Sequence, residues 1–233
     1  MKRNLSLQFT EKHFIYLEVM KKLLFGIILS LSSLLVLAQD EPLKSFRLGL
    51  TAHPNFGWIK SDIQGIESDG LRAGFSYGLL GDFYFTENYA FSTALKLTTI
   101  NGQTTLNGTS TTNTAGVYKL QYIELPAKLK LTTNETNGIK FFGEFGLGNG
   151  FNVRAKQDVK NSSGSITVED VDIFKETAFY RASLIIGAGG EFKVGEKTAV
   201  SAGLTFDNGF TDIRKGSGTL KSSYLGLNLA VFF

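Results

Sequence analysis

Cysteine is absent from this chain of 233 residues, and proline and histidine are scarce, at three and two residues. Without cysteine there are no disulfide bonds, no thiolate metal ligands, no cysteine nucleophile and no lipid-bearing cysteine of a lipoprotein. The 26 glycines against three prolines favour a fold with many crowded strands and turns. No linker rich in proline, serine or charge divides the chain, so we expect one domain.

The chain has one long apolar run, Leu23–Leu37, of about fifteen residues, which is short for a membrane-spanning helix. Two lysines precede the run, and the small-residue pattern Val36-x-Ala38 ends it, as in a secretory signal peptide. We therefore predict a signal peptide at residues 20–38 and favour it over a retained membrane anchor. Residues 1–19 lie upstream of a complete leader, and we interpret them as an overlong gene start.

Neither sign of charge dominates the expected mature chain, residues 39–233. Residues 1–38 hold five of the 24 basic and two of the 21 acidic residues, which leaves 19 of each. The formal charge of +3 is therefore a property of the leader. A neutral mature chain offers no electrostatic footprint for nucleic acid or for an anionic membrane surface, and we expect no nucleic-acid partner.

The segment Tyr224–Phe233 alternates between a large apolar face and a small or polar face. The apolar face carries Leu225, Leu227, Leu229, Val231 and Phe233. About 9 to 11 residues suffice for a tilted strand to cross a membrane, and a terminal aromatic residue is typical of bacterial outer-membrane strands. We interpret these five residues as the signal of the closing strand of a membrane barrel.

The same period of two recurs in earlier segments of the chain. We predict eight strands, at residues 46–58, 71–85, 89–99, 117–131, 139–155, 177–193, 198–210 and 224–233. Pro126 removes one hydrogen-bond donor from the fourth strand, so we expect a bulge or a break there.

The connections between these strands alternate between long and short. Long odd-numbered connections and short even-numbered ones are typical of outer-membrane barrels, in which the outer loops are long and the periplasmic turns short. The sequence thus predicts an all-β fold: an eight-stranded antiparallel up-and-down transmembrane β-barrel over residues 39–233, with both termini in the periplasm. We expect the polar segments 101–116 and 156–176 to be surface loops.

A soluble β-sandwich or a lipocalin-like barrel is the alternative fold. Charges and repeated glycines on the polar face favour the membrane barrel, because a soluble fold lined by these charges would leave rows of Leu and Phe in water. The charged residues that we assign to the lumen are Arg47, Arg72, Asp82, Lys96, Glu124, Lys128, Lys130, Lys140, Glu144, Arg154, Arg181, Glu191 and Asp207. We expect an ionic network that fills the lumen, in which Glu124 and Glu144 bind cations such as Lys128, Lys140 or Arg72.

The segment Tyr122-Ile123-Glu124-Leu125-Pro126, followed by Lys128-Leu129-Lys130, resembles the PorT-like outer-membrane β-barrel family of Bacteroidetes. Segments 143–146 and 187–192 and the terminal Phe233 are similar to the later strands of that family. The resemblance covers residues 46–233 and implies an eight-stranded barrel in the outer membrane of a Gram-negative bacterium. It implies no catalytic motif, and the fold alone does not transfer a role in secretion.

Residue types that carry catalysis or bind metals are sparse. His53 is the only histidine after residue 38, and we expect it to be a hydrogen-bonding residue of the lumen rather than a general base. Gly187, Gly189 and Gly190 are not followed by the Lys-Ser/Thr of a phosphate loop, so we interpret them as strand glycines. The acidic residues within 169–172 lack the pattern of a calcium loop and favour a solvated acidic loop. We therefore expect no catalytic, cofactor or metal site.

Three functional classes stay open. An eight-stranded barrel encloses a lumen that side chains nearly fill, so we predict an integral outer-membrane protein with a structural or surface-interaction role through its outer loops, and not an enzyme. A narrow small-solute channel is the alternative, and a barrel enzyme is disfavoured because no catalytic cluster is evident at the loop end. The expected partners are outer-membrane lipids, the barrel assembly machinery and a surface ligand or envelope protein that the sequence does not identify.

Overall fold

The computed structural model describes residues 45–106, 114–161 and 163–233, which belong to one compact unit, Leu43–Phe233. The predicted gene start and signal peptide lie outside the described residues. The elements are β1 (Ser45–Ser61), β2 (Ile66–Tyr84), β3 (Tyr89–Leu106), β4 (Thr114–Glu124), β5 (Ala127–Thr132), β6 (Ile139–Lys160), β7 (Ile166–Asp172), the 3-10 helix η1 (Phe174–Glu176), β8 (Tyr180–Lys193), β9 (Ala199–Gly209) and β10 (Leu220–Phe232). Within the described ranges, no helix is long and apolar enough to cross a membrane.

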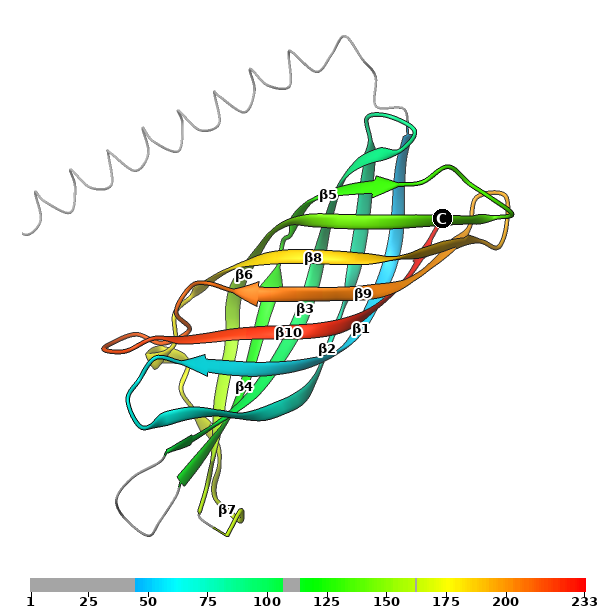
Figure 1. The fold of residues 1–233 in the computed structure, drawn as a ribbon. Helices are drawn as coiled ribbons and strands as arrows, with labels where there is room; N and C mark the ends of the chain where they lie inside the picture. The colour runs from blue at the N-terminus through cyan, green and yellow to red at the C-terminus, as the bar shows by residue number, and fades with distance from the viewer. Residues whose placement is uncertain (1–44, 107–113, 162) are drawn as a thin grey trace, which may run out of the picture. The chain divides into compact units, whose positions relative to one another are not determined.

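Antiparallel pairing closes the strands into a barrel (Figure 1). Around the ring, β1 pairs with β10, β10 with β9, β9 with β8, and β8 with β6. Both β4 and β5 lie between β6 and β3, and β2 joins β3 to β1. Because β4 and β5 are two halves of one strand of the ring, the predicted eight-stranded antiparallel barrel is confirmed.

The fourth strand of the ring is interrupted between β4 and β5, at Leu125 and Pro126. Proline has no N–H to donate to the ladder, so the regular pairing stops there. The Thr93 hydroxyl donates to the Pro126 carbonyl oxygen over 2.7 Å, and the Leu125 N–H donates to the Asn149 carbonyl oxygen over 2.8 Å. The break predicted from Pro126 is therefore confirmed, and hydrogen bonds still hold the neighbouring strands together across it.

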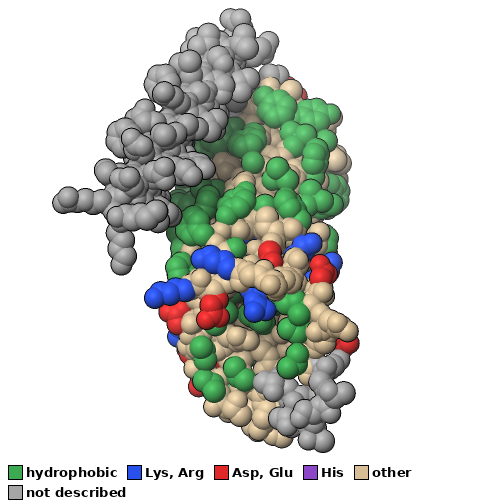
Figure 2. Space-filling view, turned by 90° about the vertical axis from the view of Figure 1, so that its left-hand side faces the viewer, with side chains coloured by type: hydrophobic (Ala, Val, Ile, Leu, Met, Phe, Trp, Pro, Cys, Tyr) green, Lys and Arg blue, Asp and Glu red, His purple; other side chains and the backbone are tan. Residues whose placement is uncertain are grey.

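Large apolar side chains cover the outside of the barrel. On the closing strand, Leu225, Leu227, Leu229 and Val231 are 40–45% exposed, and Phe233 is 58% exposed. Rows of Leu, Ile and Phe on the other strands are exposed in the same way. Figure 2 shows hydrophobic side chains gathered over one part of the surface, with Lys, Arg, Asp and Glu side chains beside it. An apolar surface of this extent is favourable against hydrocarbon and unfavourable against water.

The inner face carries glycines where neighbouring backbones approach closely. A Cβ atom added to Gly78 would overlap the carbonyl oxygen of Leu95, and one added to Gly146 would overlap the carbonyl oxygen of Ala127. No side chain fits at these two positions unless the backbone moves, which explains why residues without a side chain recur on this face of the strands.

At the end with the long connections, the strands run further than the sequence predicts. β3 and β4 pair from Leu106 and Thr114 onward, so the described part of the predicted loop 101–116 is strand. β6 continues to Lys160 and pairs with β7, within the predicted loop 156–176. Both loop predictions were wrong in extent, because these polar segments show no sustained alternation from which a strand could be recognised. We call residues 66–71 of β2, 101–106 of β3, 114–119 of β4 and 156–160 of β6, together with β7, the extension sheet.

A β-bulge lies at Val153 of β6. Gln121 of β4 pairs with Arg154 and Tyr122 pairs with Asn152, which leaves Val153 without a partner on β4. One extra residue in a strand exchanges the two faces for the residues that follow it. Accordingly Asn152 is buried, whereas Arg154, two residues later, is exposed.

We predict that Gly78→Ala destabilises the barrel by about 1 to 3 kcal/mol, because the added methyl group forces the β2 and β3 backbones apart. The matched control is Gly143→Ala, since no atom lies within 4 Å of a Cβ added to Gly143. Urea unfolding in lipid vesicles, followed by the fluorescence of Trp58, gives the free energy of unfolding of each variant. Equal stabilities for the two variants would contradict the close approach at Gly78.

Candidate functional site

Three groups of side chains occupy the lumen in succession along the barrel. The short-turn cluster, near the end with the short turns, comprises Arg47, Asp82, Lys130 and Glu191. The central cluster comprises Lys96, Glu124, Arg181 and Asp207. The apolar plug, near the end with the long connections, comprises Ile59, Ile100, Leu120, Tyr122, Ala155, Ile173, Ile213, Leu220 and Tyr224.

The short-turn cluster joins two cations to two carboxylates. Arg47 contacts Glu191 at 2.5 Å and Asp82 at 3.3 Å through its guanidinium nitrogens. The Lys130 ammonium lies 2.7 Å from Asp82 and 3.5 Å from Glu191. Arg47 also donates a hydrogen bond to the Tyr84 hydroxyl oxygen over 2.7 Å. Each charge therefore has two partners of opposite sign, which offsets the cost of removing it from water.

Aromatic rings pack against the same two cations. The Arg47 guanidinium carbon lies 4.4 Å from the centre of the Phe232 ring, and the Lys130 ammonium lies 4.8 Å from that centre. Lys130 is also 5.0 Å from the centre of the Phe142 ring. Cation–π attraction therefore adds to the ion pairs. We did not predict this role from the sequence, although an aromatic residue on the glycine-rich face was an available signal.

The lumen also contains a further buried ion pair and a buried histidine. The Lys128 ammonium contacts Glu144 at 2.7 Å, as we expected of Glu144 from the sequence. His53 is 3% exposed, and its Nε2 shares a hydrogen bond of 2.6 Å with the Thr51 hydroxyl. Each contact gives one buried polar atom of His53 and of Glu144 a partner inside the barrel.

Arg181 links the two carboxylates of the central cluster and is 2% exposed. Its guanidinium nitrogens lie 2.5 Å from Asp207 and 3.5 Å from Glu124, and its Nε donates to the Ser222 hydroxyl over 2.9 Å. Glu124 also contacts the Lys96 ammonium at 3.1 Å. The planar fork of donors on arginine is suited to binding two carboxylates at once. The cluster carries two charges of each sign and is therefore neutral.

The apolar plug fills the lumen near the long connections. Ile173, which follows β7, and Ile213, which lies between β9 and β10, are 7% and 2% exposed. They belong to the same core as Leu120, an inward residue at the outer end of β4 that is fully buried. A cavity of about 200 Å³ lies beside them, lined in part by Thr177 and Arg214. We did not predict the apolar plug from the sequence. The available signal was a set of apolar residues at inward positions, where other parts of the strands carry polar residues.

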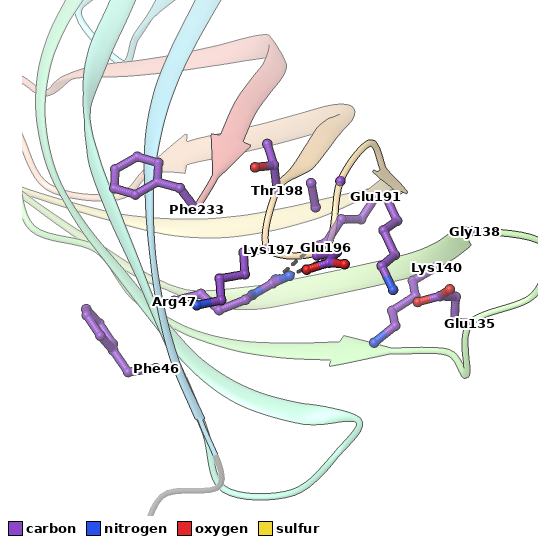
Figure 3. Close-up of a pocket in the computed structure, with 13 residues that line it drawn as sticks. Phe46, Arg47, Glu135, Gly138, Lys140, Glu191, Glu196, Lys197, Thr198 and Phe233 are labelled. Carbon is purple, nitrogen blue, oxygen red and sulfur yellow. Dashed lines mark hydrogen bonds and ion pairs between the residues drawn. The ribbon is translucent and has the colours of Figure 1, made fainter.

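A cavity of about 340 Å³ lies at the end with the short turns (Figure 3). Lys140, Lys193 and Lys197 contribute to its lining. Arg47 and Glu191 line it as well, and Figure 3 shows the two side chains reaching toward each other from their separate strands. The cavity is therefore bounded by an ion pair of the short-turn cluster.

Three of the predicted lumen residues lie away from the ion pairs that we expected. Arg72 is half-buried and donates a hydrogen bond to the Gln103 side chain. Lys140 lines the cavity beside the short turns. Arg154 was predicted to face the lumen, and this prediction was wrong: its side chain is exposed, because the bulge at Val153 reverses the faces of β6 beyond it.

Outside the lumen, Asp170 of β7 joins two lysines on neighbouring strands. Its carboxylate lies 2.7 Å from the Lys156 ammonium and 3.0 Å from the Lys119 ammonium. Hydrogen bonds from Lys156 and then from Lys119 lower the pKa of Asp170 to about 2. The stabilisation from these pairs is present above the ordinary pKa of an aspartate and is lost only as the pH falls toward 2.

The acidic segment 169–172, which we predicted to be a solvated loop, lies in the strand β7. Among the residues that the structure describes, no group of three or more His, Asp or Glu side chains is arranged to hold a metal ion.

Residues 37–215 match a family model described as outer membrane protein beta-barrel domain, which is more than half of the chain. No curated protein matches the sequence.

Similar solved structures include three outer-membrane or surface proteins. Neisserial surface protein A is 14% identical, with a TM-score of 0.46 and coverage of 81% of this chain and 97% of that chain. The outer membrane protein OprG from Pseudomonas aeruginosa is 11% identical, with a TM-score of 0.38 and coverage of 80% and 93%. Ail, the attachment invasion locus protein of Yersinia pestis, is 12% identical, with a TM-score of 0.34 and coverage of 81% and 97%.

We predict that Glu124→Gln lowers the free energy of unfolding by about 3 to 5 kcal/mol, because Lys96 then loses its carboxylate partner inside the barrel and Arg181 keeps only Asp207. Glu196→Gln, at an exposed position in a short turn, is the control and should leave the stability unchanged. Urea unfolding in lipid vesicles measures both. A wild-type midpoint for Glu124→Gln would show that water solvates the two cations inside the barrel.

Proposed function

The chain belongs to the outer membrane protein beta-barrel domain family, and from that premise we propose that it is a closed barrel that acts through the surface formed by its extension sheet. As a member of this family it is an outer-membrane barrel protein. The proposal concerns the role that the barrel performs there, which is structural or one of surface interaction rather than solute transport.

The filled lumen is the observation that carries the proposal. A solute that crossed the barrel would have to pass the short-turn cluster, the central cluster and the apolar plug in turn. Opening either cluster would separate buried ion pairs, which costs several kcal/mol. The described lumen carboxylates are held by these cations, so we assign no enzymatic step to them.

The extension sheet is the part best placed to meet a partner. Every residue of β7 is exposed, and β7 pairs with β6 alone among the described strands. Its apolar residues Ile166, Val168 and Val171 are 50%, 50% and 38% exposed. An edge strand with exposed apolar side chains offers both hydrogen-bonding groups and apolar area to another molecule. We propose a surface ligand or an envelope protein as the partner, in addition to the surrounding lipids and the barrel assembly machinery.

The orientation that we propose places the short turns and both termini in the periplasm and the extension sheet outside the cell. Outer-membrane barrels have short periplasmic turns and longer outer connections. We further propose membership of the PorT-like group of Bacteroidetes, which rests on the segment Tyr122–Pro126. In that segment, Tyr122 and Glu124 are buried in the lumen and Pro126 ends the strand pairing.

We predict that the purified mature protein produces no steady conductance in planar lipid bilayers, because the two ionic clusters and the apolar plug fill its lumen. An open porin reconstituted in the same way is the positive control. Large, steady single-channel currents from the wild-type protein would favour the narrow small-solute channel instead.

Because the chain has no cysteine, single cysteines report its orientation without background. We predict that Ser163→Cys, in the turn between β6 and β7, reacts with a membrane-impermeant maleimide on intact cells. Glu196→Cys, in the short turn between β8 and β9, should react only after lysis. The reverse pattern of labelling would invert the topology.

A further inference from the structure

The side chain of Arg154 points to the outside of the barrel, where the ion pairs of the lumen do not account for its charge. The bulge at Val153 turns Arg154 away from the ionic clusters, and its guanidinium makes no ion pair with any of the described residues. A β-bulge of this kind often re-aims a side chain for a purpose. The residues around Arg154 indicate which kind of ligand its guanidinium group can bind.

Arg154 lies immediately beyond the apolar surface of the barrel. Strand pairing aligns a row of outward apolar residues across five strands: Tyr77, Leu97, Ile123, Phe151 and Tyr180. The next row outward contains Thr99, Gln121 and Arg154, which lie two residues further along β3 and β4 and three further along β6 because of the bulge. The row after that contains Asn101, Lys119 and Lys156. The outer surface thus changes from apolar to cationic within two steps of about 7 Å each along the strands.

These polar residues surround one pocket. A cavity of about 320 Å³ is lined by Thr99, Asn101, Lys119, Gln121, Arg154 and Lys156, together with Asp170. Aromatic residues lie below it: the Phe151 ring is 5.7 Å from the Phe179 ring and 5.8 Å from the Tyr180 ring. Aromatic side chains of this kind are enriched at the level of lipid headgroups.

The pocket carries an excess of positive charge. Asp170 lies between Lys119 and Lys156, and Asp158 contacts Lys119 at 2.7 Å. Among the residues that line the pocket, Lys119, Arg154 and Lys156 are cations and Asp170 is the carboxylate. Arg154 is the lining cation without an ion pair among the described residues. The two aspartates hold the lysines in place, while the guanidinium is left with a fork of donors that matches a phosphate group.

We propose that this pocket binds the phosphate group of an anionic lipid in the membrane leaflet nearest the extension sheet. The pocket lies at the border of the apolar surface, which favours a lipid over a free phosphate ion. The acyl chains of the lipid would pack against Ile123 and Phe151 while its headgroup reaches Arg154. The identity of the leaflet rests on the proposed orientation of the barrel, whereas the binding itself does not.

The same cations could serve only to hold the β6–β7 hairpin against β4. Lys119 and Lys156 do serve that purpose through Asp170. Arg154 does not, because it contacts neither aspartate. A substitution of Arg154 therefore tests lipid binding with little effect on the hairpin.

The test uses native mass spectrometry of the mature protein, refolded in detergent and mixed with bisphosphorylated lipid A as the probe. We expect wild type to retain the lipid, and Arg154→Gln to bind it about tenfold more weakly, since it loses a charge-assisted pair of hydrogen bonds. Lys197→Gln, at the other end of the barrel, is the matched control and should bind as wild type does. Unchanged heat-modifiable migration in gels shows that each variant is folded.

Two further binding measurements on the wild-type protein distinguish a lipid phosphate from a free phosphate ion. Lipid A from which both phosphates have been removed should bind at least about tenfold more weakly, and inorganic phosphate should not displace the intact lipid. Equal retention by Arg154→Gln and wild type, equal binding of the dephosphorylated lipid, or displacement by inorganic phosphate would each overturn the proposal. Conductance and cysteine labelling do not depend on this result, so a failure here is distinct from a failure of the proposed function.

Discussion

A strand edge that faces hydrocarbon leaves a row of unpaired N–H and C=O groups, so a sheet in a membrane has to close on itself. The ladders of β1 with β10 and of β2 with β3 achieve this closure. At this small diameter, closure brings the inward side chains together, and the charges among them have to pair because little water remains to solvate them. The apolar outside and the paired inside are therefore two results of the same closed ladder.

Charged side chains are arranged differently inside and outside the barrel. The short-turn cluster and the central cluster each contain as many carboxylates as cations, and aromatic rings cover the cations further. Outside, Arg154 has no ion pair with any of the described residues, at a place where water and headgroups are available. A single inserted residue, Val153, decides on which side of the wall Arg154 lies.

Local signals in the sequence were sufficient for the strands, for their apolar faces and for the break at Pro126, because alternation and the missing proline N–H act within a few residues. Other features depend on what lies opposite in the closed ring. Arg47 and Glu191 are 144 residues apart in the chain, so their contact follows from the barrel and not from spacing. The bulge that exposes Arg154 is likewise visible only in the pairing of β6 with β4, and β7 has water on both faces and therefore no alternation to detect.

The packing of Phe232 against Arg47 and Lys130 also affects the order in which the interior of the barrel is completed. Arg47 lies on β1 and Phe232 on β10, so the cluster and the ring that covers its cations draw on the first and last strands of the described residues. The Phe232 ring can cover Arg47 and Lys130 only once β10 has paired with β1, whatever the earlier strands have done. The interior at this end of the barrel is thus finished in one late step, which couples the burial of its charges to the joining of the first and last strands.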